Sequence, residues 1–188
     1  MDRSDRDGRR FHNIFFALYP DDQTAQQAID LTCLLQRRHG LVGPAMTRDR
    51  LHITLRRVCG AYDPPQHDIE RAMAAAASVR MPPFVVGLDR VLSWPNKRRA
   101  HPLVAVGDDG DIGVRMLHER LEIALRQGGM AKPGRRAITP HMTLLWGPVE
   151  APETAIPTLC FAASEFRLID SPHGEGRHHV LGRWPLEP

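Results

Sequence analysis

Two short segments of the chain repeat the pattern His, apolar residue, Thr, Leu. They are residues 52–55 (His-Ile-Thr-Leu) and residues 141–144 (His-Met-Thr-Leu). In an extended strand successive side chains alternate between faces, so each histidine shares a face with its threonine, and the two apolar residues point the other way. Each tetrad therefore predicts a strand with one polar face and one face that packs in the core.

Two histidines and two threonines that face one groove suit the cleavage of a phosphodiester by general acid and base. One of the imidazoles of His52 and His141 can take a proton from the attacking oxygen while the other gives a proton to the leaving oxygen. The hydroxyls of Thr54 and Thr143 can donate to the non-bridging phosphate oxygens. A single His-x-Thr in a strand is usually an ordinary structural residue pair, so it is the repetition that indicates a site.

The surroundings of the tetrads are repeated in register. Each histidine follows a glycine by twelve residues and a proline by eight, namely Gly40 and Pro44 in the first half and Gly129 and Pro133 in the second. We therefore predict a duplicated unit of strand, helix, loop and motif strand, related by a pseudo-twofold axis. The expected fold is α+β, with two antiparallel sheets lining a central groove and helices outside.

Hydrophobic periodicity places the other elements. Residues 1–10 are expected to form a flexible arm, and residues 11–188 one bilobal domain. Strands are predicted at 11–19, 51–58, 84–93, 101–106, 161–169 and 179–186. Helices are predicted at 23–38, at 67–79 and from 108–111 to the glycines at 128–129.

Composition bounds the setting in which the protein acts. The chain has 188 residues, a net charge of +3 and a pI near 9.1, a mild basic excess that suits a polyanion without identifying one. The chain contains no run of eighteen apolar residues, so no membrane span is predicted. Cys33, Cys59 and Cys160 are widely separated and lack CxxC spacing, which argues against a disulfide framework or a zinc site and favours a reducing cytoplasm. We expect a monomer.

The chain resembles the 2H phosphoesterases, specifically the LigT-like RNA 2',3'-cyclic phosphodiesterases, also called the 2'-5' RNA ligase family. The resemblance rests on the two tetrads, on FFALYP at residues 15–20, and on FRLIDS and LGRWPL at residues 166–171 and 181–186. It spans residue 11 to the end of the chain.

The resemblance implies a bilobal fold, no metal or organic cofactor, and hydrolysis of a 2',3'-cyclic phosphate to a 2'-phosphate. It assigns His52 as proton donor to the leaving 3'-oxygen and His141 as proton acceptor from water. The implied partner is RNA with a 2',3'-cyclic phosphate end or a small cyclic nucleotide. The alternatives are a phosphodiesterase or ligase acting on 2'-5' linkages or small cyclic nucleotides, and an RNA-end-binding module without catalysis.

One feature departs from the family pattern. Bacterial members typically carry an aromatic residue after the first tetrad and an arginine after the second, whereas this chain has Arg57 and Trp146 there. One interpretation is that Arg57 binds phosphate and Trp146 stacks on a base; the other is that Arg57 is solvated and Trp146 packs in the core. In a regular strand neither side chain enters the groove, so only a bulge or the strand end could bring them there.

Further basic residues are weaker candidates. Arg135 and Arg136 precede the second tetrad and could contact an RNA backbone. His173, His178 and His179 lack carboxylate or cysteine ligands at metal-binding spacing, so we interpret them as surface residues.

Overall fold

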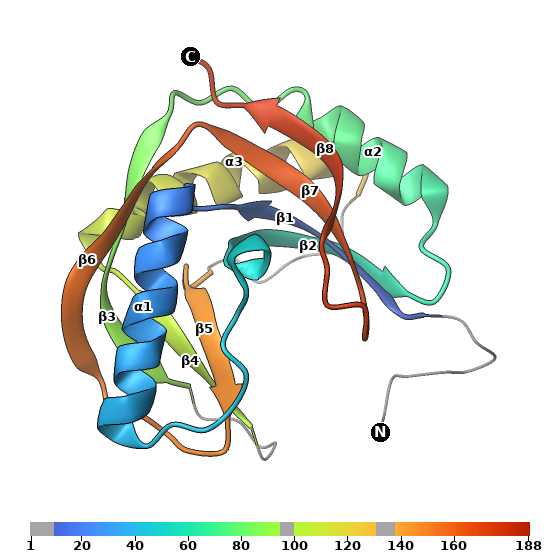
Figure 1. Ribbon diagram of the computed structural model, residues 1–188. Coiled ribbons are helices and arrows are strands. Elements are labelled where there is room, and N and C mark those ends of the chain that lie inside the picture. Colours follow the sequence, from blue (N-terminus) through green and yellow to red (C-terminus); the bar gives the residue numbers. More distant parts are fainter. Residues whose placement is uncertain (1–9, 95–99, 131–137) are drawn as a thin grey trace.

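The computed structural model describes residues 10–94, 100–130 and 138–188, and its three helices and eight strands form an α+β fold (Figure 1). The helices are α1 (Asp22–His39), α2 (Gln66–Ala76) and α3 (Ile112–Gln127), with short 3-10 turns η1 (Arg48–Arg50) and η2 (Asp109–Asp111). The strands are β1 (His12–Leu18), β2 (Ile53–Ala61), β3 (Phe84–Ser93), β4 (His101–Val106), β5 (Met142–Gly147), β6 (Thr154–Ala163), β7 (Glu165–Pro172) and β8 (His179–Pro185).

The strands form one antiparallel sheet in the order β6-β3-β4-β5-β2-β1-β7-β8. The motif strands β5 and β2 are neighbours at its centre, as the duplication predicts, and the pair Ile53 and Met142 joins them. The α+β, antiparallel prediction is confirmed. The two expected sheets are the two four-stranded halves, which meet edge to edge at the tetrads.

The two copies of the repeated unit are interlocked. The first copy contributes β1, α1 and β2, and its next strand, β3, pairs with β4 of the second copy. The second copy contributes β4, α3 and β5, and its later strand β7 returns to pair with β1. The helices cross as well: α1 packs against β5 and β6, whereas α3 packs against β2. Each half of the sheet therefore contains strands of both copies.

Helix α1 shows how local sequence sets these elements. The Asp21 carboxylate accepts a hydrogen bond of 2.8 Å from the Thr24 N–H, which caps the first turn. The helix ends at Gly40, whose φ of 62° suits a residue without a Cβ and whose N–H donates to the Gln36 carbonyl. The Thr24 hydroxyl donates to the Cys160 carbonyl at 2.8 Å and fixes α1 on β6.

The prediction of one strand over residues 161–169 was wrong. The chain forms β6 up to Ala163 and β7 from Glu165, with Ser164 between them. Strand β6 lies at the edge of the sheet, and most of its side chains are at least partly exposed. It also contains Pro157, which an edge strand tolerates. Its buried side chains alternate from Leu159 to Ala163, and this pattern does not extend across Pro157.

The two faces of the sheet differ in their packing. The large core, built around side chains such as Phe16, Ile53, Met142 and Phe166, fills the face that carries the apolar residues of the tetrads. On the opposite face of β1, Phe15 and Ala17 pack with Ile169 and the partly buried Tyr19 in a separate small cluster. We call this second face, on which the histidines and threonines of the tetrads lie, the tetrad face.

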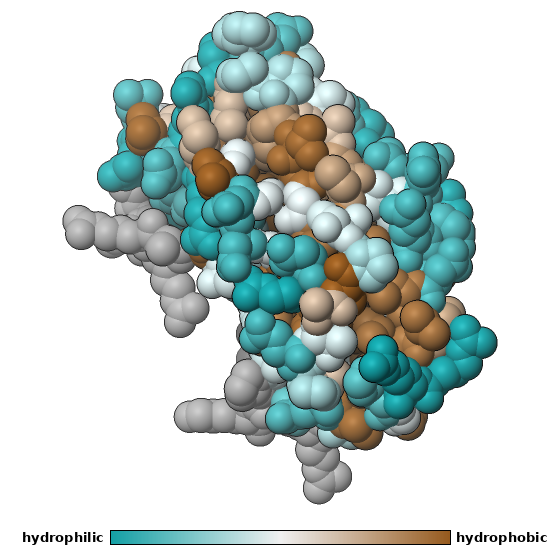
Figure 2. Space-filling model, turned by 90° about the vertical axis from the view of Figure 1, so that its left-hand side faces the viewer, coloured by the Kyte–Doolittle hydropathy of each residue, from teal (hydrophilic) through white to brown (hydrophobic). Residues whose placement is uncertain are grey.

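The outer surface is mixed in character. Seen from the side on which β6, β3 and α1 lie, hydrophobic groups stand among hydrophilic ones (Figure 2). A hollow between α1 and β6 is lined in part by Leu31, Leu34, Pro157 and Leu159. In the ranges that the structure describes, no helix is long and apolar enough to cross a membrane. Cys33, Cys59 and Cys160 are free thiols. The predicted N-terminal arm lies almost wholly outside the described residues, which begin at Arg10.

Candidate active site

The tetrads meet at the centre of the sheet. Ile53 and Met142 are paired across the two strands, and both are fully buried. In an antiparallel register, the histidine of each tetrad then lies beside the threonine of the other, on the face opposite this buried pair. Diagonal neighbours across such a pair are about 7–8 Å apart, so the two imidazoles can address one phosphate. The four residues brought together are His52, Thr54, His141 and Thr143.

Both histidines are held by the same contact. Nδ1 of His52 lies 2.6 Å from the carbonyl oxygen of Arg50, and Nδ1 of His141 lies 2.8 Å from that of Thr139. A carbonyl oxygen can only accept, so each Nδ1 carries the proton and donates. In the neutral ring the lone pair is then on Nε2, which leaves that nitrogen of both residues available to a substrate.

The proton affinity of the two imidazoles is reduced. Burial lowers the pKa of His52 to about 4; the hydrogen bond to the Arg50 carbonyl opposes this shift, and the positive charge of Arg50 and that of a protonated His141 add to it. Burial also lowers the pKa of His141, again opposed by its carbonyl contact. Both imidazoles of the free protein are therefore neutral at pH 7, and an anion bound between them would raise both pKa values.

His52 sits in an aromatic cluster. Its ring stacks on Phe15 and Tyr19, with centroid distances of 5.2 and 5.9 Å, and meets the ring of His178 edge-on at 5.0 Å. Nδ1 of His178 lies 2.7 Å from the Tyr19 hydroxyl, and burial lowers the pKa of His178 to about 4, with the charge of His52 contributing. The interpretation of His178 as a surface residue was wrong. His173 and His179 are exposed, as predicted.

His141 has a different neighbour. The indole ring of Trp94 lies 4.2 Å from the imidazole, measured between centroids. Trp94 directly follows β3, the strand of the first copy that pairs with the second copy. The end of β3 therefore places Trp94 beside the second tetrad. Trp94 was not predicted as a site residue, because nothing local connects it with residue 141.

Each tetrad ends in a β-bulge. In the pairing of β2 with β1, Thr54 faces Ala17 and Arg56 faces Phe16, so Leu55 is left without a partner. In the pairing of β5 with β4, Leu144 is skipped in the same way, between Thr143 and Leu145. A bulge adds one residue to a strand and so reverses which face the following side chains occupy.

The bulges bring Arg57 and Trp146 onto the tetrad face. Arg57 pairs with Phe15 and Trp146 with Pro102, in each case two partner residues from the position opposite the threonine. Trp146 is 40% exposed, so the interpretation that it packs in the core was wrong. Arg57 is exposed and extends over Gly60, where a Cβ atom would lie 1.8 Å from its Nη2 atom.

The carbonyl oxygen of each bulged leucine accepts a hydrogen bond from outside the sheet. The Leu55 carbonyl accepts from Nδ1 of His118 at 2.9 Å, and the Leu144 carbonyl from the backbone N–H of Met46 at 2.8 Å. His118 lies on α3 and is only 3% exposed. His118 was not predicted as a site residue, although a histidine beside the apolar stripe of a predicted helix was the available signal.

A cavity of about 420 Å³ opens beside the tetrads. Thr54, Arg57, His141 and Trp94 line it, and it extends past β2 to the His118 side chain and the Arg56–Glu122 ion pair. His52 and Thr143 are not among its lining residues.

Arg135 and Arg136 lie outside the described residues. Within the described ranges, no three His, Cys, Asp or Glu side chains are grouped as a metal site requires.

Comparisons with known proteins identify the family of the chain. The family model of the 2'-5' RNA ligase superfamily matches residues 20–172. No curated protein sequence matches significantly. Among solved structures, Escherichia coli LigT in its apo form is 24% identical with a TM-score of 0.74, over 95% of this chain and 99% of that one. The Thermus thermophilus protein TT0787 is 17% identical with a TM-score of 0.70, over 93% and 97%.

A more distant structure shares the fold. Kluyveromyces marxianus Usb1 is 12% identical with a TM-score of 0.56, over 95% of this chain and 99% of that one. At these identities the structural likeness describes the fold, whereas the family model covers most of the chain. On that match the chain belongs to the 2'-5' RNA ligase superfamily, the LigT-like 2H phosphoesterases.

Proposed function

We propose that this protein hydrolyses the 2',3'-cyclic phosphate at the end of an RNA chain to a 2'-phosphate, without a metal ion. The single observation that carries the proposal is the pairing of two His-x-Thr segments on one sheet face, each histidine fixed through Nδ1. This leaves two equivalent Nε2 atoms, one to accept a proton and one to donate a proton.

The proposed reaction is a direct displacement by water. One imidazole takes a proton from the water as its oxygen bonds to phosphorus, and the bond from phosphorus to the ribose 3'-oxygen breaks. The other imidazole supplies the proton that this 3'-oxygen needs as it leaves, so the phosphate stays on the 2'-oxygen. Thr54 and Thr143 donate hydrogen bonds to the non-bridging oxygens, where negative charge increases.

The surroundings of the tetrads support a nucleotide substrate. Arg57 lies in the same cavity as Thr54 and His141 and can bind a phosphate oxygen. Trp94 and the exposed Trp146 offer aromatic faces on which a base can stack. E. coli LigT has been crystallised with 3'-AMP and with phosphate, ligands of the class proposed here. Arg135 and Arg136 remain predicted RNA contacts.

The roles of the two histidines can be separated. The family resemblance makes His52 the proton donor, whereas deep burial and the nearby charge of Arg50 favour a neutral His52 before substrate binds. A nucleoside phosphodiester with a p-nitrophenol leaving group needs no proton donor. The alanine variant of the donor should recover activity on this ester, and the variant of the acceptor should not.

The deciding experiment uses an oligonucleotide with a 2',3'-cyclic end in buffer containing EDTA. A product with the phosphate on the 2'-hydroxyl supports the proposal, and a 3'-phosphate product or a strict metal requirement contradicts it. Parallel reactions with a 2'-5'-linked dinucleotide and a cyclic mononucleotide test the other substrates that the family name suggests. Binding of the cyclic end without turnover would indicate an RNA-end-binding module.

We also propose that the protein acts as a cytoplasmic monomer in which residues 11–188 form one bilobal domain. Limited proteolysis should remove only about residues 1–10, and size-exclusion chromatography with light scattering should give a mass near 21.1 kDa.

A further inference from the structure

A second polar cavity adjoins the candidate site. Its volume is about 520 Å³, and Arg57 lines both this cavity and the one beside the tetrads. The other polar side chains in its wall are Asn13, Arg50, Ser171 and His173. It therefore lies over the half of the sheet made by β1, β2 and β7, next to the first tetrad.

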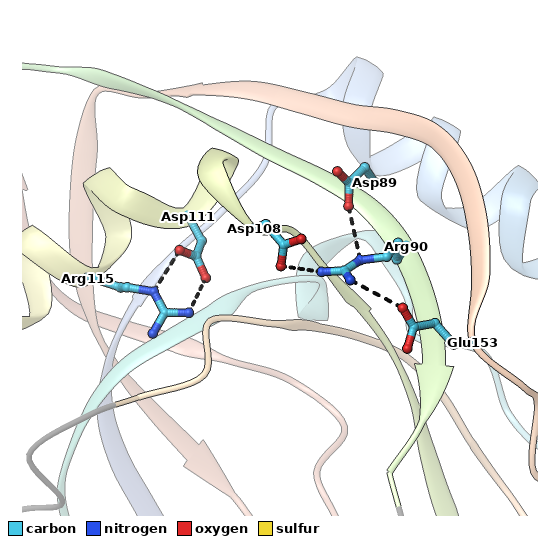
Figure 3. Close-up of polar contacts among 6 residues, drawn as sticks. All are labelled: Asp89, Arg90, Asp108, Asp111, Arg115 and Glu153. Carbon is cyan, nitrogen blue, oxygen red and sulfur yellow. Dashed lines mark hydrogen bonds and ion pairs between the residues drawn. The ribbon is translucent and has the colours of Figure 1, made fainter.

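The two arginines of this cavity differ from the structural arginines of the fold. Arg90 is surrounded by Asp89, Asp108 and Glu153, and Arg115 is bound through two nitrogens to Asp111 (Figure 3). In contrast, Arg50 and Arg57 have no carboxylate within ion-pair distance among the residues the structure describes. Their charges are therefore available to an external anion.

Two polar atoms in the wall of this cavity also indicate a ligand. Nε of Arg50 and Oδ1 of Asn13 are shielded from solvent, yet neither has a hydrogen-bond partner in the described part of the chain. Leaving such groups unpaired costs free energy, so native proteins rarely do so without a ligand or ordered water. A phosphate suits the guanidinium group of Arg50, and Oδ1 of Asn13 can accept a hydrogen bond from a sugar hydroxyl.

The position relative to the tetrads suggests what this anion is. Arg50 precedes His52 by two residues, and Arg57 lies two partner positions beyond Thr54 because of the bulge, roughly 7 Å along the strand. We propose that this cavity binds the phosphate on the 5' side of the terminal nucleotide, so that the protein selects RNA chain ends over cyclic mononucleosides. The inference rests on the proposed function, which places the cyclic phosphate at the tetrads.

The experiment compares kcat/KM for three substrates. They are a nucleoside 2',3'-cyclic phosphate, the same compound with a 5'-phosphate, and a dinucleotide that ends in a 2',3'-cyclic phosphate. We expect the two substrates with the additional phosphate to be preferred by on the order of 10-fold, the effect of one charge-assisted contact. Arg50→Ala should abolish this preference, and Arg50→Lys should retain part of it.

The ratio between substrates makes the test specific. Removing the Arg50 charge also changes the proton affinity of His52, but that effect acts on all three substrates and cancels in the ratio. Arg38→Ala removes the same charge from an exposed position on α1 and should leave the preference unchanged. Equal kcat/KM for all three substrates in the unmodified protein, or an unchanged ratio in Arg50→Ala, would overturn the inference. Loss of hydrolysis of every substrate by the unmodified protein would instead overturn the proposed function.

Discussion

The two tetrads share their backbone geometry and differ in their surroundings. In both, the histidine Nδ1 bonds the carbonyl oxygen two residues earlier, the third residue is a partly buried threonine, and the leucine forms a bulge. His52, however, packs in a cluster with Tyr19 and His178, whereas His141 meets Trp94. The two tetrads thus share the hydrogen bond of the histidine, whereas the side chains packed around each histidine set its electrostatic environment.

The hydrogen bonds to the bulged leucines also differ between the two tetrads. The Leu144 carbonyl is bonded by the backbone of the loop after α1, and the Leu55 carbonyl by the side chain of His118 from α3. Both copies therefore supply a hydrogen-bond donor at this point, but from different chemical sources. The first tetrad depends on one side chain, which makes it more sensitive to substitution.

The largest expected effect concerns the two imidazoles. His52→Ala and His141→Ala should each lower kcat by about 10²–10⁴-fold, because each removes a proton-transfer group. Single-turnover kinetics on the cyclic-ended oligonucleotide measure this, with the exposed His67→Ala as the matched control. Activity near that of the unmodified protein in either variant would mean that the tetrads do not form one site.

The next largest effects are expected from substitution of the residues that follow the bulges. Arg57→Ala should raise KM by roughly 10–100-fold, since a charge-assisted phosphate contact is lost. Trp146→Ala should have a smaller effect, of about 5–10-fold, because it removes only stacking on a half-exposed ring. Steady-state kinetics of both variants measure these changes in KM. If neither KM changes, the exchange of arginine and aromatic residue relative to the family has no function.

The bulge support can be tested through stability. His118→Ala should lower the free energy of unfolding by about 1–3 kcal/mol, because it leaves the buried Leu55 carbonyl without a donor. His118→Asn offers an amide N–H near the position of Nδ1 and should retain part of this stability. Urea unfolding of the two variants provides the comparison. Equal loss in both would show that packing, and not the hydrogen bond, is what His118 contributes.

The smallest expected effect is on pH dependence. One imidazole must be protonated and the other neutral, so kcat/KM should peak between their two pKa values in the free protein. The pKa of His52 is about 4 and that of His141 is lowered from 6.5, so the optimum should lie on the acid side of pH 6.5. Arg50→Ala removes a charge that lowers the pKa of His52, so the acid limb should move to higher pH. An optimum above pH 7 in the unmodified protein would contradict these assignments.

Much of the fold could be predicted from local pattern. The helix predicted over 23–38 is observed over 22–39, and the strands predicted at 84–93 and 101–106 match β3 and β4. The tetrads also predicted which of their residues are buried, since the alternation of side chains in a strand is a local property. The start of strand β6 could not be predicted, because the alternation of buried side chains from Leu159 to Ala163 does not extend across Pro157.

Two His-x-Thr strands, and a duplicated unit that brings them together, could be read from the amino-acid pattern alone. The groups that surround these strands could be identified only in the folded protein. His178, Trp94 and His118 reach the tetrads from distant segments through the crossing of strands and helices between the two copies. The positions of Arg57 and Trp146 depended on bulges that appear only when the neighbouring strands are paired. Strand register and long-range packing are properties of the assembled sheet, so no local pattern could specify them.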